Sequence, residues 1–364
     1  MKASPIRFAI IGSGSIAEKH AQAIAAVPGA KLIAVWGRDP NRGRSFAKTL
    51  GVDFVTDLPS LAARDDLDAV TIATPSGAHA ESSLPFLRQG KAVLCEKPLE
   101  IAMEKADLMI DTAREHGALL AGVFQQRLGV GAQAMKKAVC GGRFGTITLA
   151  SAQLKWWREQ TYYDSVSWRG TLLLDGGGAL MNQGIHVVDL LQWLVGMPSE
   201  VFSYSACLAH KRIEVEDTAI IALRYPSGAL GTIEASTACK PGFAMRIELC
   251  GDKGSAVLED DRIARWQFDD ERPEDESVRT MGSGAIVGGS GDPRAIGFEG
   301  HRILIEDLVG AIHEKRPPMI PGSEARNAVQ LILAAYESVR SGKPCHLFQP
   351  KKYAQTNSMA RTKK

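Results

Sequence analysis

Lys97 is a residue whose type and setting suit proton chemistry. It lies in the stretch CEKPLE, residues 95–100, where an apolar run ends and a helical-looking segment follows. Open parallel sheets place their functional groups at the carboxyl ends of strands. A lysine that is partly desolvated there has a lowered pKa and can polarise or deprotonate a hydroxyl group. The alternative is an ordinary surface lysine in a soluble loop.

Asn182 and His186 form a second candidate pair, in the stretch GALMNQGIHVVDLLQWL. They are four residues apart and therefore share one face of a predicted helix. An imidazole there can accept the proton of a hydroxyl group, and the amide can orient that hydroxyl. A lone helical histidine is also commonly a satisfied core or surface residue. Asp189, one turn further on, either orients the imidazole or faces solvent.

A glycine-rich turn joins the first predicted strand to the first predicted helix. The stretch AIIGSGSIAEKHAQAI places Gly12, Gly14 and Ala17 in G-x-G-x-x-A spacing. The first glycine allows a tight turn, the second lets a pyrophosphate approach the backbone, and the small third residue lets helix and strand pack closely. The phosphate then lies over the amino end of the helix. We predict dinucleotide binding by Gly12, Ser13, Gly14, Ser15 and Ile16, the alternative being a turn that binds nothing.

Arg38 follows the second predicted strand, where an acidic residue would bind a ribose 2′-hydroxyl. An arginine there can pair with a 2′-phosphate, which favours NADP over NAD. It can equally stack on the adenine while Asp39 caps the next helix. The sequence therefore gives a slight preference for NADP.

Two further strand ends border the same predicted crevice. The stretch ATPSGAH, residues 73–79, follows one apolar strand, and CEK, residues 95–97, ends the next. The alternative for ATPSGAH is an ordinary polar loop with a helix cap. We expect cofactor contacts from Thr74, Pro75, Ser76, His79, Glu96, Lys97 and Gln126.

The segment KWWREQTYYDSVSWRG, residues 155–170, is aromatic and basic in a chain with only 6% aromatic residues. Aromatic rings stack on sugar faces, and arginines bind hydroxyls, carboxylates or phosphates. We expect substrate contacts from Arg158, Tyr163, Trp168 and Arg169, and two arginines would fit an anionic substrate such as a uronic acid or a nucleotide sugar. The alternatives are a loop that packs on the domain interface, or arginines that stabilise the cofactor.

The predicted secondary structure around these residues changes in character along the chain. The first third alternates strands and helices, which implies βαβ units and a parallel sheet. After about residue 125 the strands follow one another with hairpin signals such as PSG and GDKG, which indicates a largely antiparallel sheet in a second domain. The acidic and then glycine-rich segment 270–298 is expected to be a mobile surface excursion.

Composition excludes several classes of protein. The chain has 364 residues, 45% hydrophobic and 23% charged, with a formal net charge of +2, so nothing favours nucleic acid or an anionic membrane as partner. No apolar run is long enough for a transmembrane helix, and the first residues lead directly into a strand without a signal peptide. The six cysteines are scattered without a C-x-x-C pair, which indicates reduced thiols and a cytoplasmic protein. The dispersed histidines indicate no metal site.

Taken together, the motifs resemble one oxidoreductase family. The stretches IIGSGSIAEKHAQAI, ATPSGAHAE, EKPL, GGGALMNQGIHVVDLLQWLVG and PGSEARNAVQLILAAYESVRSGKP carry this resemblance. They are similar to the glucose-fructose oxidoreductase, inositol dehydrogenase and MocA (Gfo/Idh/MocA) family. The resemblance implies an α/β fold with an N-terminal Rossmann domain, a doubly wound parallel sheet, at residues 1–125. It also implies a C-terminal substrate-binding and oligomerisation α/β domain with an open, mostly antiparallel sheet at 126–348, whose closing helices would pack back on the first domain. Residues 349–364 would form a flexible tail.

The resemblance also implies site residues. Family members often hold the Lys–Pro bond cis, so Lys97–Pro98 is predicted to be cis. His186 matches the family's catalytic histidine. Many relatives have aspartate four residues before it, where this chain has Asn182. An amide cannot serve as a base, so the proton relay rests on His186 and Lys97.

The expected activity is therefore NAD(P)-dependent hydride transfer between a nicotinamide and a secondary hydroxyl or keto carbon. The substrate would be a sugar, a cyclitol or a nucleotide sugar, which is what the family acts on. One alternative is a glycosidase that uses bound NAD for transient oxidation, and another is a non-catalytic NAD(P)-binding regulator. By analogy with the family, we expect a homodimer or homotetramer.

Overall fold

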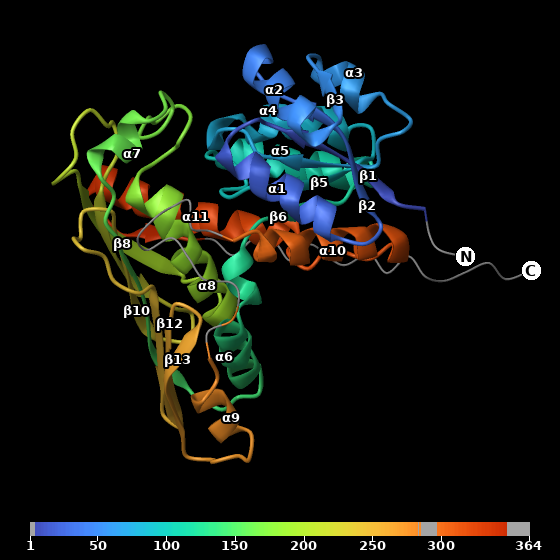
Figure 1. Ribbon diagram of the computed structural model, residues 1–364. Helices are drawn as coiled ribbons and strands as arrows, with labels where there is room; N and C mark the ends of the chain where they lie inside the picture. The colour runs from blue at the N-terminus through green and yellow to red at the C-terminus, as the bar shows by residue number, and fades with distance from the viewer. Residues whose placement is uncertain (1–3, 283, 285–296, 348–364) are drawn as a thin grey trace, which may run out of the picture.

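A six-stranded parallel sheet forms from the first third of the chain, as the alternation of strands and helices predicts (Figure 1). The computed structural model describes residues 4–282, 284 and 297–347. The strand order reverses between β1 and β4, and open α/β sheets bind ligands at such a reversal. Across the sheet the strands are β3 (Asp53–Val55), β2 (Ala30–Trp36), β1 (Ile6–Ile11), β4 (Ala69–Ile72), β5 (Ala92–Cys95) and β6 (Leu120–Gly122).

Helices cover this sheet, which explains why its central strands are continuously apolar. All the residues of β4 and β5 are buried. The edge strand β3 was not predicted from the sequence. The helices of this domain are α1 (Ser15–Ala26), α2 (Pro40–Leu50), α3 (Leu58–Ala62), α4 (His79–Leu87) and α5 (Met103–Glu115), with short 3₁₀ turns η1 (Ser76–Ala78) and η2 (Gln125–Leu128).

The second sheet has eight strands and is mostly antiparallel, as predicted (Figure 1). Only β7 and β10 pair in parallel; the other neighbours are antiparallel. Across the sheet the strands are β13 (Arg262–Phe268), β12 (Gly254–Glu259), β11 (Arg246–Gly251), β7 (Ile147–Lys155), β10 (Leu230–Ser236), β9 (Thr218–Arg224), β8 (Glu200–Ala206) and β14 (Cys345–His346).

The helix predicted around Asn182 and His186 packs on one face of this second sheet. It begins as a π-helical segment, η3 (Ala179–Gly184), and continues as α8 (Ile185–Val195). Single π-helical turns are frequent at functional sites. The segment contacts β7 and β10, and α6 (Val130–Cys140) packs beside α8. The sheet therefore holds the predicted catalytic helix against the rest of the protein.

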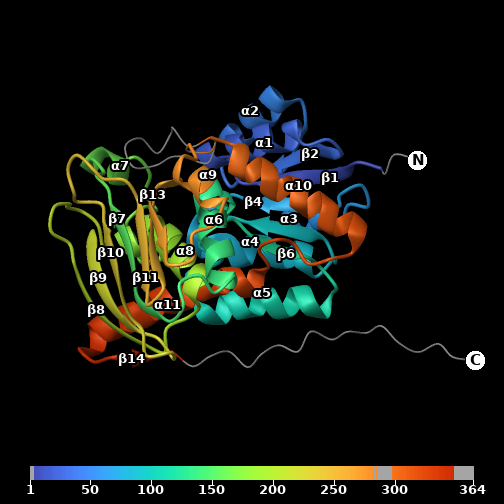
Figure 2. The same ribbon diagram turned by 90° about the horizontal axis from the view of Figure 1, so that it is seen from below.

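Of the last two long helices, one packs on the first domain and the other connects the two domains. Helix α10 (Glu299–Glu314) lies against α1, and α11 (Gly322–Ser341) contacts α5, α8 and β8 (Figure 2). The C-terminal helical segment thus fixes the position of the first domain relative to the second. Within the described residues, no helix combines the length and the apolar composition that crossing a membrane requires.

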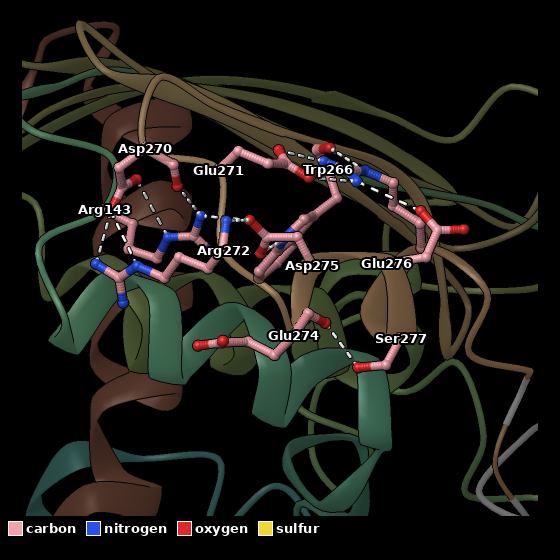
Figure 3. A network of polar contacts seen from close by, with 10 residues as sticks. Arg143, Trp266, Asp270, Glu271, Arg272, Glu274, Asp275, Glu276 and Ser277 are labelled. Atoms are coloured by element: carbon pink, nitrogen blue, oxygen red, sulfur yellow. Dashed lines mark hydrogen bonds and ion pairs between the residues drawn. The ribbon is translucent and has the colours of Figure 1, made fainter.

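Part of the segment 270–298 is held in place by a polar network, contrary to the expected mobile excursion. Helix α9 (Asp275–Arg279) lies against β13. The buried Asp275 carboxylate accepts hydrogen bonds from the Arg143 guanidinium at 2.5 and 2.7 Å and from Trp266 Nε1 at 2.6 Å (Figure 3). The sequence does not reveal that pair because its members are far apart in the chain. Residues 283 and 285–296, and the tail at 349–364, lie outside the described residues.

Candidate active site

A cavity of about 730 Å³ lies between the carboxyl edge of the first sheet and the second domain. Loops after β1, β4 and β5 form one wall. The opposite wall comes from the segment after β7 and from η3 and α8. The site therefore lies where the strand order reverses, the expected position for a ligand in a doubly wound sheet.

The glycine turn has the shape that dinucleotide binding requires. Gly12 has φ +129°, and a Cβ atom there would lie 2.4 Å from the Ala73 carbonyl oxygen. Gly14 precedes α1, and a Cβ atom there would meet nothing within 4 Å, so the backbone faces open space at the amino end of the helix. Such space suits a pyrophosphate. All five residues predicted for this contact line the cavity: Gly12, Ser13, Gly14, Ser15 and Ile16.

The far end of the same wall is where an adenosine would lie. Arg38 is exposed and lines the cavity beside Trp36 and Arg42. Asp39 Oδ1 accepts hydrogen bonds from the backbone N–H groups of Asn41 and Arg42 and so caps α2. Asp39 therefore caps the next helix, as one alternative expected, while Arg38 lines the cavity and its stacking on an adenine stays a prediction.

His79 joins two of the loops that bear predicted cofactor residues. Its Nδ1 lies 2.7 Å from the Pro98 carbonyl oxygen, and its Nε2 lies 3.1 Å from the Thr74 carbonyl oxygen. The side chain is buried, so its ring fixes the loop after β4 against the loop after β5. The other residues predicted for this wall also line the cavity: Thr74, Pro75, Ser76, Glu96, Lys97 and Gln126.

Lys97 reaches across the cavity to the second domain. Its Nζ donates to the backbone carbonyl of Asn182 at 2.7 Å and lies 3.4 Å from Asn182 Oδ1. Burial lowers the pKa of Lys97, while the charges of Glu96 and Asp175 oppose that shift. The Lys97–Pro98 bond is cis, as the resemblance predicted. The amine is thus held at the junction of the domains.

His186 lies in the same cavity, and its imidazole is neutral at ordinary pH. Burial, followed by the nearby Lys97 charge, lowers the pKa of His186 to about 3. Its Nδ1 is buried and has no hydrogen-bond partner among the described residues. A neutral imidazole beside an amine can accept a proton from a hydroxyl group that both of them contact.

Asp189 does neither of the two things expected of it. Its carboxylate is buried and accepts hydrogen bonds from Arg127 at 2.7 and 2.8 Å. It therefore does not face solvent. Asp189 Oδ1 also accepts a hydrogen bond from Gln192 Nε2 at 3.2 Å, so Arg127 and Gln192 together occupy the oxygens that would orient an imidazole. Arg127 also pairs with Glu324 of α11, so this cluster fixes α8 to the closing helix.

Asp175 is a polar residue of the site that the sequence analysis missed. Its Oδ1 accepts from Asn182 Nδ2 at 2.7 Å, and its Oδ2 accepts from the Gly170 backbone N–H at 2.8 Å. Asp175 thereby fixes the Asn182 amide, with Oδ1 towards Lys97. The stretch DGGG contains this aspartate, but Asp175 precedes the helix and lies outside its periodic pattern. Behind it, a Cβ atom on Gly178 would lie 1.7 Å from the Glu216 carbonyl oxygen, so only glycine fits there.

The aromatic and basic segment brings most of its predicted residues to the cavity, with one exception. Tyr163 is buried elsewhere, with its hydroxyl 2.7 Å from Thr237 Oγ1, and it does not line the cavity. Its neighbour Tyr162 lines the cavity instead, and its hydroxyl accepts from Gln183 Nε2 at 2.9 Å. Both tyrosines belong to the short helix α7 (Gln160–Asp164), where adjacent residues point in different directions.

Two arginines surround Tyr162 and make this end of the cavity electropositive. The Arg169 guanidinium lies 4.0 Å from the centre of the Tyr162 ring, and that of Arg158 lies 5.6 Å away. Both charges act to lower the pKa of Lys97. Trp168 lines the cavity as predicted, and Trp156 lines it as well. An anionic group would be stabilised at this end.

Three residues that are far apart in the sequence meet behind the Lys97 loop. His20, Glu96 and His301 each bring one potential ligand atom within 4.8 Å of the others, and all three are buried. The sequence indicated no metal site because the histidines are dispersed, and only the tertiary structure brings these two together. The contacts within this cluster are hydrogen bonds between each imidazole and the Glu96 carboxylate.

Comparison with known proteins places the two domains in one group. Residues 6–124 match the family model described as oxidoreductase family, NAD-binding Rossmann fold (Gfo/Idh/MocA), and residues 132–257 match the GFO/IDH/MocA C-terminal domain.

Individual relatives cover most of the chain. The WlbA dehydrogenase of Bordetella pertussis, solved with NADH and UDP-GlcNAcA, is 32% identical, with a TM-score of 0.87, over 96% of this chain and 100% of the other. The WlbA dehydrogenase of Chromobacterium violaceum, solved with the same two ligands, is 32% identical, with a TM-score of 0.86, over 96% and 98%. The inositol 2-dehydrogenase of Rhizobium meliloti is 29% identical over 71% of this chain and 76% of its own.

Proposed function

Because the chain belongs to the Gfo/Idh/MocA family of NAD-dependent oxidoreductases, we propose that it is a dehydrogenase for a nucleotide sugar that carries a carboxylate. Relatives in this family act on CH–OH groups of sugars and cyclitols. The observation that carries the narrower proposal is the position of Arg158 and Arg169 in the cavity that holds Lys97 and His186. Two guanidinium groups suit an anionic substrate better than a neutral one.

The nicotinamide, when bound, supplies the acceptor for the hydride of a secondary carbinol. His186 accepts the hydroxyl proton, which its neutral form allows. Lys97 donates a hydrogen bond to the same oxygen as negative charge builds on it. Asn182 orients Lys97, and Asp175 orients Asn182. Tyr162 and Trp168 would contact the sugar ring. The two arginines would bind its carboxylate or a phosphate.

We propose NAD as the cofactor, although Arg38 alone slightly favours NADP. The two WlbA relatives contain NADH. Arg38 is then expected to stack on the adenine rather than bind a 2′-phosphate. Comparing the Michaelis constants for NAD and NADP of wild type and Arg38→Asp tests this assignment. A wild type that prefers NADP, with a preference lost in the variant, would restore the NADP assignment.

We also propose a homodimer or homotetramer formed through the open face of the second sheet. Neighbouring strands place exposed apolar side chains on that face: Leu149, Tyr204, Ile220 and Leu230. The six unpaired cysteines support a reducing, cytoplasmic location. Light scattering of the wild type and of Ile220→Lys tests the assembly, and a monomeric wild type would contradict it.

The test of the activity is an assay of the purified chain with NAD and with NADP over a substrate panel. UDP-GlcNAcA is the probe, and UDP-GlcNAc, which lacks the carboxylate, is its matched control. Inositol and glucose represent neutral substrates. We expect reduction of NAD with UDP-GlcNAcA and much less with UDP-GlcNAc. Turnover of the neutral sugars alone would refute the substrate proposal.

Variants test the chemical roles. Lys97→Ala and His186→Ala should each reduce turnover by about 10²-fold or more, because each removes a group that contacts the reacting oxygen. NADH binding, measured by fluorescence, should persist in both. Near-normal turnover would contradict these roles. Release of aglycone without net NADH formation would instead identify the glycosidase alternative.

A further inference from the structure

Glu96 connects three separate elements immediately beside Lys97. The Nε2 atoms of His20, on α1, and His301, on α10, lie 3.1 and 2.7 Å from the same oxygen, Glu96 Oε1. The other oxygen, Oε2, accepts the backbone N–H of Lys97 at 3.2 Å. The two imidazole rings meet edge to face with their centres 4.7 Å apart. The carboxylate is therefore held from the first and from the second-last helix of the chain.

These contacts decide the charge of the cluster. Burial alone would raise the pKa of Glu96, but hydrogen bonds from His20 and His301 outweigh it and hold that pKa well below the usual range. Burial lowers the pKa of His20. The Nδ1 atoms of both histidines are buried without partners among the described residues. A proton on Nδ1 would be an unpaired buried donor, so the proton that each ring donates to Glu96 is placed on Nε2.

A metal centre is the other possible use of two histidines and a glutamate, and the geometry disfavours it. Metal-bound histidines donate their second ring N–H to a carboxylate, a carbonyl or a water. Neither Nδ1 has such a partner among the described residues. The Nε2 atoms, which a metal would need unprotonated, are the atoms that donate to Glu96. The hydrogen bonds of the cluster are thus satisfied by one carboxylate and two imidazole N–H donors.

We propose that His20 and His301 are positioning residues that act through Glu96 to keep the Lys97 amine charged and in place. The inference rests on the proposed function for the catalytic role of Lys97. The effect of the cluster on the protonation of the Lys97 amine does not depend on that function. The buried cluster holds both the Glu96 carboxylate and the backbone N–H of Lys97. Its hydrogen bonds therefore determine the position of the Lys97 backbone and the charge that lies beside the side-chain amine. Neither histidine needs to touch the substrate.

The charges that face Lys97 explain why this cluster should matter. Glu96 on its own loop and Asp175 on the opposite wall favour the ammonium form, while Arg169 and Arg158 disfavour it. His186 is neutral. If Glu96 is lost as an anion, one carboxylate remains against two guanidinium groups. Lys97 should then lose its proton at a lower pH and become a poorer donor to the reacting oxygen.

Competitive acetylation of the full-length protein measures this state without any substrate. Trace acetic anhydride is applied from pH 6 to 10, and the Lys97 peptide is quantified by mass spectrometry, since only the unprotonated amine reacts. His301→Phe keeps an aromatic ring but cannot donate a hydrogen bond to Glu96. The pH at which acetylation of Lys97 is half-maximal should therefore fall by about 1 pH unit. His301→Gln, whose amide can donate, should restore the wild-type midpoint. His313→Gln, an exposed histidine of the same helix, is the matched control.

Glu96→Gln gives a second and independent measurement. It removes the charge while it keeps the size of the side chain, so its midpoint should also fall, whether or not His301→Phe folds normally by circular dichroism. Wild-type midpoints in folded His301→Phe, or in Glu96→Gln, would overturn the proposal. A stoichiometric metal in the purified wild type, lost in His301→Phe, would overturn it too.

Kinetics separate this proposal from the proposed function. If UDP-GlcNAcA is turned over, the rate for His301→Phe should decline at a lower pH than that of wild type, with an unchanged KM for NAD. His301→Gln should behave as wild type. If no substrate of the panel is turned over, the proposed function fails, while the acetylation result still decides the role of the cluster.

Discussion

The side-chain amine of Lys97 donates a 2.7 Å hydrogen bond to the backbone carbonyl of Asn182 across the junction of the two domains. A backbone acceptor does not change with the Asn182 side chain, so the amine retains one contact in any variant at position 182. The side chain adds a longer contact, through Oδ1, and the link to Asp175. Substitution of Asn182 therefore removes the side-chain contact to Lys97 and keeps the backbone contact.

Asn182→Ala should lower kcat by about tenfold, because one hydrogen bond to a charged group is lost and Asp175 Oδ1 loses the Asn182 donor. Lys97→Ala should cost more. Asn182→Asp should not substitute, since its carboxylate would face Asp175 at hydrogen-bond distance and one of the two would have to bind a proton. Steady-state kinetics with saturating NAD measure this, with Asn327→Ala on α11 as the control. Wild-type kcat in Asn182→Ala would show that the backbone contact suffices.

His186 should make the protein less stable in mild acid. Its pKa is lowered from 6.5 to about 3 in the folded state, so between these values the unfolded chain binds the additional proton. The free energy of unfolding must therefore fall as pH falls through that window. His186→Gln, which cannot titrate, should lose less stability between pH 6.5 and 4 than wild type. Urea denaturation at several pH values measures the difference, and equal slopes would contradict the buried neutral imidazole.

The two arginines of the cavity should determine the preference of the enzyme for a substrate that carries a carboxylate. Arg169→Met keeps the aliphatic stem but removes the guanidinium, so the KM for UDP-GlcNAcA should rise by about 10- to 100-fold, the value of one charge-assisted hydrogen bond. The KM for UDP-GlcNAc should change less. Arg158→Met should act in the same direction. Arg212→Met, an exposed residue paired with Asp164, is the control. An equal loss with both substrates would show that the arginines bind a group common to both.

The Arg143–Asp275 pair should stabilise the second domain. Asp275→Asn leaves the buried Arg143 with only its longer pair to the half-exposed Asp270 at 3.4 Å, which should cost about 3 kcal/mol of unfolding free energy. The Arg143 hydrogen bonds lower the pKa of Asp275, so the stability they provide is present at neutral pH and is lost as pH falls below about 4. Thermal denaturation at pH 7 measures this. Arg340→Ala, which breaks an exposed pair with Glu337, should change it by about 0–1 kcal/mol.

Features that depend only on neighbours along the chain could be predicted from the amino-acid sequence. The turn at Gly12 and Gly14 needs only local spacing, and the alternation of strands and helices needs only periodicity. The order of motifs identified the family, and that resemblance led to the prediction of roles for Lys97 and His186. The choice of Tyr163 failed because periodicity within a single turn of helix cannot say which of two adjacent tyrosines faces a cavity.

The tertiary structure alone decided which distant side chains meet. Asp189 pairs with Arg127 and not with the imidazole, and Asp175 reaches Asn182 because the DGGG turn brings it back along the helix. His301 meets Glu96, 205 positions away, only because α10 packs on α1. Contacts of that kind depend on how whole elements pack, and no local pattern encodes packing between elements so far apart in the chain.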